Sequence, residues 1–185
     1  MTFGERMIGA AKLDVATFED IERDQTAMGH AVGVIALAAL AGGLANIWYG
    51  GVTGIVSGFI MMIVGYVIWA VIVWVVGTKL MPDPATKADF PETFRVISFA
   101  AVPWLLAIVT IIPLLGWLLM FIVYPVAWLW SMAIMVIAVR QVLDYTDTFK
   151  AVIVVVIGFF VVMLVWLMFV MLGLSAAFFG AALSR

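Results

Sequence analysis

The sequence predicts an all-α integral membrane protein whose core is a bundle of five transmembrane helices. Of its 185 residues, 67% are hydrophobic and only 11% are charged, whereas a soluble globular chain carries roughly 25% charged residues. A chain this apolar lacks the polar surface that would keep it dissolved in water. Its long apolar runs do not alternate between polar and apolar residues, as the strands of a membrane barrel do.

Five runs are long enough to cross a bilayer. The hydrocarbon core offers no hydrogen-bond partners, so a spanning backbone forms a helix of about 20 apolar residues. We expect spans at about residues 27–48, 52–77, 94–112, 114–139 and 151–172. Short turns with glycine or proline join the first two spans and the next two, which predicts two helical hairpins. Residues 27–185 then form one transmembrane domain behind a segment of residues 1–26.

Basic residues set the orientation. Eight of the nine lie before span one, between spans two and three, or between spans four and five, and only Arg185 lies at the other side. The positive-inside rule therefore predicts a cytoplasmic N-terminus and an external C-terminus. All eleven acidic residues lie on the cytoplasmic side as well. We expect recognition of soluble partners at that face, because the outer face has almost no charge.

The segment before span one is acidic and periodic. Residues 1–26 carry six acidic and three basic residues. Their apolar positions predict two short amphipathic helices, one through Phe3 and Met7 and a second through Phe18 and Ile21. Asp14 stands where an N-cap of the second helix belongs.

Two roles remain open for this segment. Peripheral membrane helices are usually rich in lysine and arginine, so an anionic bilayer should repel this one. We expect it to fold back as a cap on the basic inner ends of the chain's own helices. The alternative is a free tail that binds another protein through Phe18, Glu19, Glu22 and Asp24.

The residue inventory argues against an enzyme. The chain has no cysteine and one histidine, His30, and no aspartate lies within a predicted span. His30 has only Glu22 and Asp24 nearby in sequence, whereas zinc normally takes three or four ligands. We therefore expect no catalytic residue, no metal and no cofactor. A pI near 5.2 also argues against nucleic-acid binding, which uses basic patches.

Two patterns lie within the spans. Small residues let helices approach closely in lipid, and the stripe of Gly50, Gly54, Gly58 and Gly65 on span two favours packing within the chain over a homodimer face. Prolines kink helices and free backbone carbonyls. Spans three and four therefore offer either ordinary core packing or an apolar pocket for a lipid chain, formed by Pro103, Trp104, Pro125, Trp128 and Trp130.

Charged residues lie at the inner ends of spans three and four. Arg140 and Asp144 have i,i+4 spacing, which suits an ion pair on one helix face, and Arg95 begins span three at the same boundary. Two such arginines can snorkel to lipid headgroups or bind an anionic lipid between helices. The simpler interpretation is anchoring by positive charge plus one salt bridge.

Several stretches resemble the bacterial branch of the Yip1 family. They are residues 6–14 and 18–24, residues 94–103 with an arginine at the start of a span and a proline within it, and residues 135–144. The resemblance covers most of the chain, in the same order and with five spans. Eukaryotic Yip1 proteins associate with Rab GTPases and vesicle-coat machinery, but their Asp-Leu-Tyr-Gly-Pro segment is absent here, so Rab binding is not implied.

Two functions follow from these observations. The first is a non-enzymatic membrane-organising or trafficking-type adaptor in a prokaryotic inner membrane, which binds a protein partner or membrane lipids at its cytoplasmic face. The alternative is a small transporter, channel or lipid-handling protein. Transport usually leaves ionisable residues in mid-span, and spans two to five carry none there.

The orientation has a direct test. A reporter enzyme that is active only outside the cytoplasm should be active when it is fused after Arg185, because the charge asymmetry places that end outside. A reporter that works only in the cytoplasm should be silent in the same position. The reverse pattern would contradict both the orientation and the odd number of spans.

Overall fold

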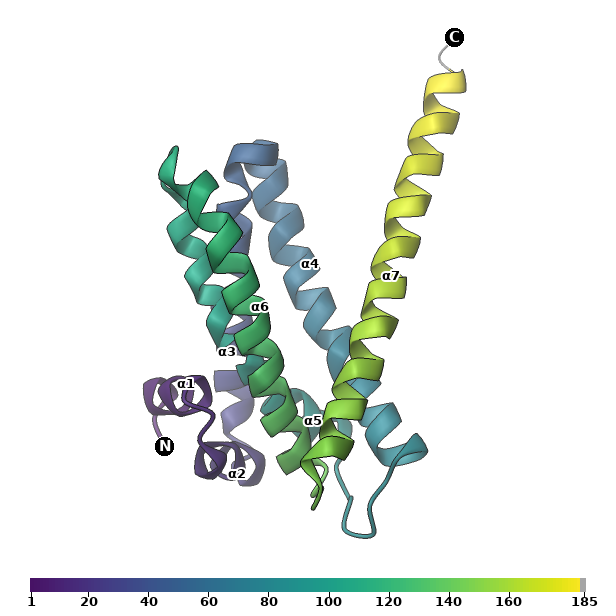
Figure 1. Cartoon of the computed structure of the whole chain (residues 1–185). Coiled ribbons are helices and arrows are strands. Elements are labelled where there is room, and N and C mark those ends of the chain that lie inside the picture. Colours follow the sequence, from purple (N-terminus) through teal and green to yellow (C-terminus); the bar gives the residue numbers. More distant parts are fainter. Residues whose placement is uncertain (184–185) are drawn as a thin grey trace.

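The computed structural model describes the backbone of residues 1–183 and the side chains of residues 1–48 and 50–171. Two short helices, α1 (Phe3–Ala11) and α2 (Val15–Arg23), lie across one end of a bundle of longer helices (Figure 1). We call this end the basal end; the positive-inside rule predicts it to be cytoplasmic. The opposite, apical end carries the short turns that join the two helices of each hairpin.

The longer helices follow in order. They are α3 (Ala27–Ala45), α4 (Ile47–Val75) with a π-helical turn η1 (Val76–Leu80), α5 (Phe90–Ile97) with a 3₁₀ helix η2 (Ser98–Ile111), α6 (Leu115–Val142) and α7 (Thr148–Leu183). Five segments are long and apolar enough to cross a membrane: Ala27–Ala45, Gly50–Leu80, Phe90–Ile111, Leu115–Val142 and Thr148–Met171. The all-helical fold class with five candidate spans is confirmed. The chain is a multi-pass integral membrane protein.

The third span lies at the centre of the bundle. η2 packs between α3 and α6, and α4 packs on the other side of α3. α7 touches α4 and α6 near the basal end, where Ala151 and Val154 are buried, and leans away from both toward its C-terminus (Figure 1). The tightly packed core therefore occupies the basal half of the bundle.

Span three is not α-helical throughout. Only its first part, α5, is α-helical, and the 14 residues of η2 are 3₁₀, although 3₁₀ runs longer than 3–4 residues are uncommon. Pro103 lies inside η2 and removes one backbone N–H. Ala100, Ala101 and Ala107 are buried, and their small side chains let the thin 3₁₀ helix fit between its neighbours.

Capping boxes fix the starts of two helices. At α1, Thr2 and Glu5 cap each other's backbone N–H groups, and Asp89 and Glu92 do the same at α5. Such a box satisfies two N–H groups that the helix leaves free. Span three consequently begins at Phe90 rather than near residue 94. Asp14 stands at the N-cap of α2 as predicted, but its carboxylate accepts from the Thr17 hydroxyl instead of a backbone N–H.

The α3–α4 hairpin brings two glycines against the preceding helix. A Cβ atom at Gly54 would lie 2.7 Å from the Asn46 carbonyl oxygen, and one at Gly58 would lie 3.1 Å from the Gly43 Cα. Close packing does not extend to Gly50 or Gly65, where a Cβ atom would meet nothing within 4 Å. The predicted stripe is therefore wrong at its two ends. Gly50 lies in the hairpin turn, before the break in the helix at Gly51 (φ 55°, ψ −140°), and Gly65 lines a cavity.

Gly54→Leu should lower the free energy of unfolding in detergent by about 1–3 kcal/mol, since a side chain there overlaps backbone that has little room to move. Gly50→Leu is the matched control, because its side chain enters open space. Denaturant unfolding followed by tryptophan fluorescence measures both. Equal stability of the two variants would contradict this packing.

Candidate functional site

The N-terminal helices are built into the basal end. Ala10, Phe18 and Ile21 are fully buried and belong to the same apolar core as residues of the bundle. α1 packs on η2, and α2 packs on α5 and α6. Phe18 therefore serves the core and is not a contact for an external partner, which corrects that part of the tail hypothesis.

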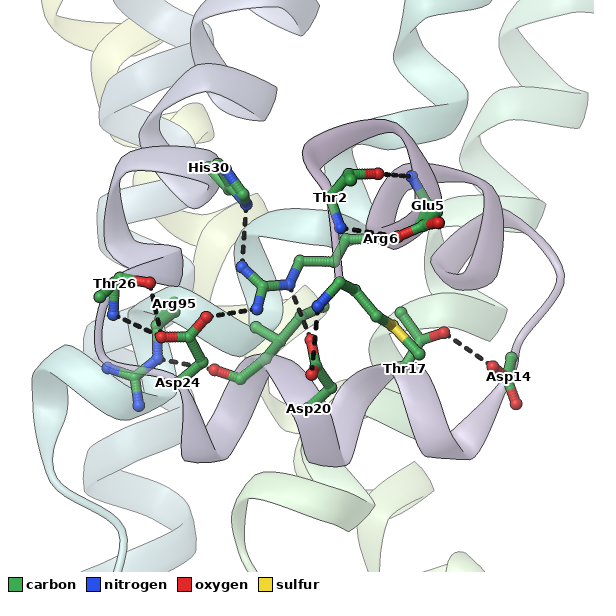
Figure 2. Close-up of polar contacts among 12 residues, drawn as sticks. Thr2, Glu5, Arg6, Asp14, Thr17, Asp20, Asp24, Thr26, His30 and Arg95 are labelled. Carbon is green, nitrogen blue, oxygen red and sulfur yellow. Dashed lines mark hydrogen bonds and ion pairs between the residues drawn. The ribbon is translucent and has the colours of Figure 1, made fainter.

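Arg6 connects three helices (Figure 2). Its side chain is 1% exposed, and its Nε and terminal nitrogens donate to Asp20 at 2.8 Å and to Asp24 at 2.5 Å. The other terminal nitrogen lies 2.8 Å from Nδ1 of His30 at the start of α3. A guanidinium only donates hydrogen bonds, so Nδ1 accepts and the His30 proton sits on Nε2. These partners offset the cost of burying the charge.

The partners of Arg6 are themselves fixed. Hydrogen bonds from Thr26 and from Arg6 hold the pKa of Asp24 well below its ordinary value. The N-terminal amine lies 3.6 Å from Asp20, and the Phe3 ring contacts the His30 ring. The contacts of Arg6 were not visible in sequence, because its partners lie 14 to 24 positions away.

Two donors from the bundle satisfy the last carbonyls of these helices. Arg95 donates to the carbonyls of Ile21 at 2.8 Å and Glu22 at 2.5 Å, and Trp130 donates to Ala11 at 2.9 Å. The final four carbonyls of a helix lack partners within it, so these contacts cap α2 and α1. Arg95 is buried and not free for a lipid headgroup. The basic inner ends of the helices that we expected to hold the cap carry Lys79, Lys87, Arg95, Arg140 and Lys150. Within the described structure, only Arg95 of these bonds residues 1–26.

The predicted Arg140–Asp144 pair does not form. α6 ends at Val142, and Asp144 lies beyond it with a positive φ of 52°. Arg140 instead donates to the Tyr145 carbonyl at 3.4 Å, and no ion pair within 4 Å joins it to Asp144 in the described chain. The i,i+4 rule fails because the helix stops before the second residue.

The loops at the basal end are tied to one another. Tyr145 donates to the Met81 carbonyl at 2.7 Å, and Thr86 donates to the Leu143 carbonyl at 2.6 Å. Lys150 forms an ion pair with Asp83 and lies over the Tyr145 ring. Burial raises the pKa of Tyr145 to about 12, so its hydroxyl stays a donor.

Glu22 faces other carboxylates at the seam between α2 and the bundle. Partial burial, Asp144 and Glu92 raise its pKa from 4.5 to about 7, against the opposing effect of Arg23. Glu19 and Arg23 form only an exposed pair at 3.4 Å, which contributes little stability. Within the described residues, no three histidine, cysteine or acidic side chains gather as a metal site would require.

A cavity of about 600 Å³ lies within the spans, between α3, α4, η2, α6 and α7. Trp104 and Trp128 line it, as do Trp69 and Trp166. Three residues of the predicted pocket, Pro103, Pro125 and Trp130, are not in its lining. Trp130 is absent because its indole reaches α1, and Pro103 because it faces the packed centre of the bundle.

Two consecutive hydrogen bonds link the backbone beside Pro103 to side chains of this cavity. In a 3₁₀ helix the N–H of residue 103 would bond the carbonyl of residue 100, and proline has no N–H. Ser131 of α6 donates to that freed Ala100 carbonyl at 2.6 Å. Because the Ser131 proton is used there, the Tyr66 hydroxyl is the donor in its 3.3 Å contact with Ser131. Tyr66 and Ser131 both line the cavity.

Comparison with known families identifies the chain. The Yip1 domain matches residues 15–182. The chain belongs to the Yip1 domain family. This is a family of membrane trafficking proteins that are generally non-enzymatic. No curated protein and no solved structure matched the chain. The Yip1 match begins at the first residue of α2, so α1 and Arg6 precede the matched segment.

Arg95→Met should lower the free energy of unfolding of this Yip1-domain protein by about 2 kcal/mol, because two carbonyls of α2 lose a charged donor. Arg140→Met, which removes only one long hydrogen bond, should cost less. Co-purified anionic phospholipid should be unchanged in both variants. Loss of that lipid from Arg95→Met without loss of stability would instead identify a headgroup site.

The pKa of Glu22 predicts a pH dependence. Its folded-state pKa of about 7 lies above the ordinary 4.5, so the folded protein binds this proton more tightly than the unfolded chain. The resulting stability is fully present below pH 4.5 and is lost as the pH rises through 7. Between pH 5 and pH 7.5 the melting temperature of the parent should therefore fall more than that of Glu22→Gln, which lacks the titrating carboxyl group. Parallel pH profiles for parent and variant would contradict it.

Proposed function

We propose that this Yip1-domain protein is a non-enzymatic membrane-organising adaptor that binds a protein partner at its basal, cytoplasmic face. The supporting observation is that α1 and α2 form a fixed surface there, held by the buried Arg6 and Arg95. A preformed surface binds without the entropic cost of ordering a tail. The resemblance to bacterial members supports a location in a prokaryotic cell inner membrane.

Charge favours a basic partner over a lipid surface. All eleven acidic residues belong to this end, against eight basic ones, and two of those basic side chains, Arg6 and Arg95, are buried and engaged. With Arg6 paired to Asp20 and Asp24 and with Arg95 bound to backbone carbonyls, nine acidic and six basic residues remain, so this end keeps a net negative charge. Complementary charge steers partners together, whereas an anionic bilayer surface is repelled.

The cavity within the spans favours a second candidate, a lipid-handling protein. It is large enough for a ligand, since ligand pockets span roughly 300–1,000 Å³, and it lies among helices that face lipid. Coupled ion transport is a weaker alternative, because residues 25–78, 96–139 and 151–184 contain no lysine, arginine, aspartate or glutamate. Lipid or ion flux through purified protein in liposomes separates transport from adaptor function.

Photocrosslinking in cells tests the adaptor function. A photoreactive amino acid at Arg23, whose side chain is 79% exposed, should give a discrete protein adduct that weakens at high salt, because charge guides the encounter. The matched control is position 114 at the apical end, where Leu114 is 90% exposed and should give lipid adducts only. Lipid adducts alone at both positions would contradict the adaptor function.

A further inference from the structure

We infer that the cavity between α4, α6 and α7 holds one acyl chain of a membrane phospholipid, which enters from the apical leaflet. This inference concerns the interior of the bundle and stands independently of the partner proposed for the basal face. It rests on the depth of the cavity, the state of its polar groups, and the divergence of α7.

The depth of the cavity matches a single leaflet. Its lining on α4 runs from Gly58 to Trp69, a rise of about 16 Å along a helix. Its upper boundary includes Asn46, at the apical turn of the α3–α4 hairpin. Half of the hydrocarbon core of a bilayer is about 15 Å. A chain that starts at the apical interface therefore ends at the floor of the cavity.

The polar groups buried in the lining already have partners within the protein. Tyr66 and Ser131 bond to each other and to Ala100, and the Asn46 amide donates to the Gly42 carbonyl. No buried side-chain nitrogen or oxygen in the described structure lacks a partner. Water has little reason to fill such a site, because a buried water needs two to four polar partners. An apolar chain fills it without breaking any of these hydrogen bonds.

The remaining lining suits a flexible chain. Five methionines, Met61, Met62, Met132, Met135 and Met163, contribute to it, and methionine adapts its shape to irregular neighbours. α7 supplies Phe159, Met163 and Trp166 to one wall. α7 leans away from α4 and α6 toward the apical end (Figure 1). Because Met61, Met163 and Trp166 line the cavity and are still exposed, the cavity is open at its side and an acyl chain can enter it from the bilayer.

Among the residues whose side chains are described, no charged one lies near the apical mouth of the cavity. The apical turns and the apical halves of the spans contain no lysine, arginine, aspartate or glutamate through residues 25–78 and 96–139. A headgroup at this interface meets no ionic partner, so the site selects the chain and not the headgroup. Phosphatidylethanolamine and phosphatidylglycerol should occupy it equally well.

The test uses the full chain in vesicles of phosphatidylethanolamine and phosphatidylglycerol that contain a trace of phospholipid with a diazirine on one acyl chain. After irradiation, peptide mass spectrometry should find adducts on Met132, inside the cavity, as well as on lipid-facing residues such as Leu164. Adducts on Leu164 report bulk lipid and serve as the internal standard.

Gly65→Leu should reduce the Met132 adduct severalfold relative to the Leu164 adduct. Gly65 lines the cavity and a Cβ atom there meets nothing within 4 Å, so the new side chain occupies the volume of the acyl chain without disturbing the fold. Gly42→Leu is a second variant, because Gly42 also lines the cavity and a Cβ atom there also meets nothing within 4 Å. Gly29→Leu is the matched control, because Gly29 also faces open space but lies outside the cavity.

Three outcomes would overturn the inference. The first is a parent protein with no adduct on Met132. The second is a Met132 adduct that persists in both Gly65→Leu and Gly42→Leu while their unfolding curves match that of the parent. The third is a stoichiometric prenyl lipid, and no phospholipid, extracted from protein purified from its native membrane.

Discussion

A buried guanidinium dictates how the basal end of this Yip1-domain protein is assembled. Arg6 is 1% exposed, and a charge taken out of water costs several kcal/mol unless good partners surround it. Asp20 and Asp24 on α2 and His30 on α3 provide those partners. Because they belong to two other helices, α1 keeps its charge satisfied only while all three helices hold one arrangement.

Elsewhere in the structure, side chains hydrogen-bond backbone carbonyls that have no partner within their own helix. The ends of α1 and α2 each expose carbonyls, which the bundle satisfies with Trp130 and Arg95. Deep in the span, Pro103 frees the Ala100 carbonyl, which Ser131 satisfies from α6. At the apical end, the Trp48 indole donates to the Ile111 carbonyl, where η2 ends. In lipid an unsatisfied carbonyl costs several kcal/mol, so these few polar side chains fix helix positions that apolar packing alone leaves free.

The sequence predicted those features that depend on local pattern. Length and apolarity predicted five spans, because a bilayer imposes both. Apolar periodicity predicted two short helices, one through Phe3 and Met7 and one through Phe18 and Ile21. The 3₁₀ geometry of η2 escaped prediction, since it depends on the space left between α3 and α6. Arg95 was expected either to anchor the span by its positive charge or to bind a lipid headgroup, because nothing local indicates that the carbonyls of Ile21 and Glu22 lie beside it.

Pair rules failed where the helix boundary was uncertain. Arg140 and Asp144 have the right spacing for an ion pair, but α6 ends between them. Likewise Gly50 and Gly65 share a stripe with Gly54, yet only the middle of the stripe meets α3. The capping boxes at Thr2 and Asp89 were readable in the sequence, since acidic residues follow each at the third position.

Hydrogen exchange of the amides of residues 15–21 tests most directly whether the Arg6 network makes α2 part of the bundle. In purified parent protein without any partner, these amides should be protected, and Arg6→Met should speed their exchange, because the ion pairs that hold α2 are lost. Arg23→Met, which removes only an exposed pair, should leave their exchange unchanged. Rapid exchange throughout residues 1–26 of the parent would contradict the account and would mean that this segment is a free tail.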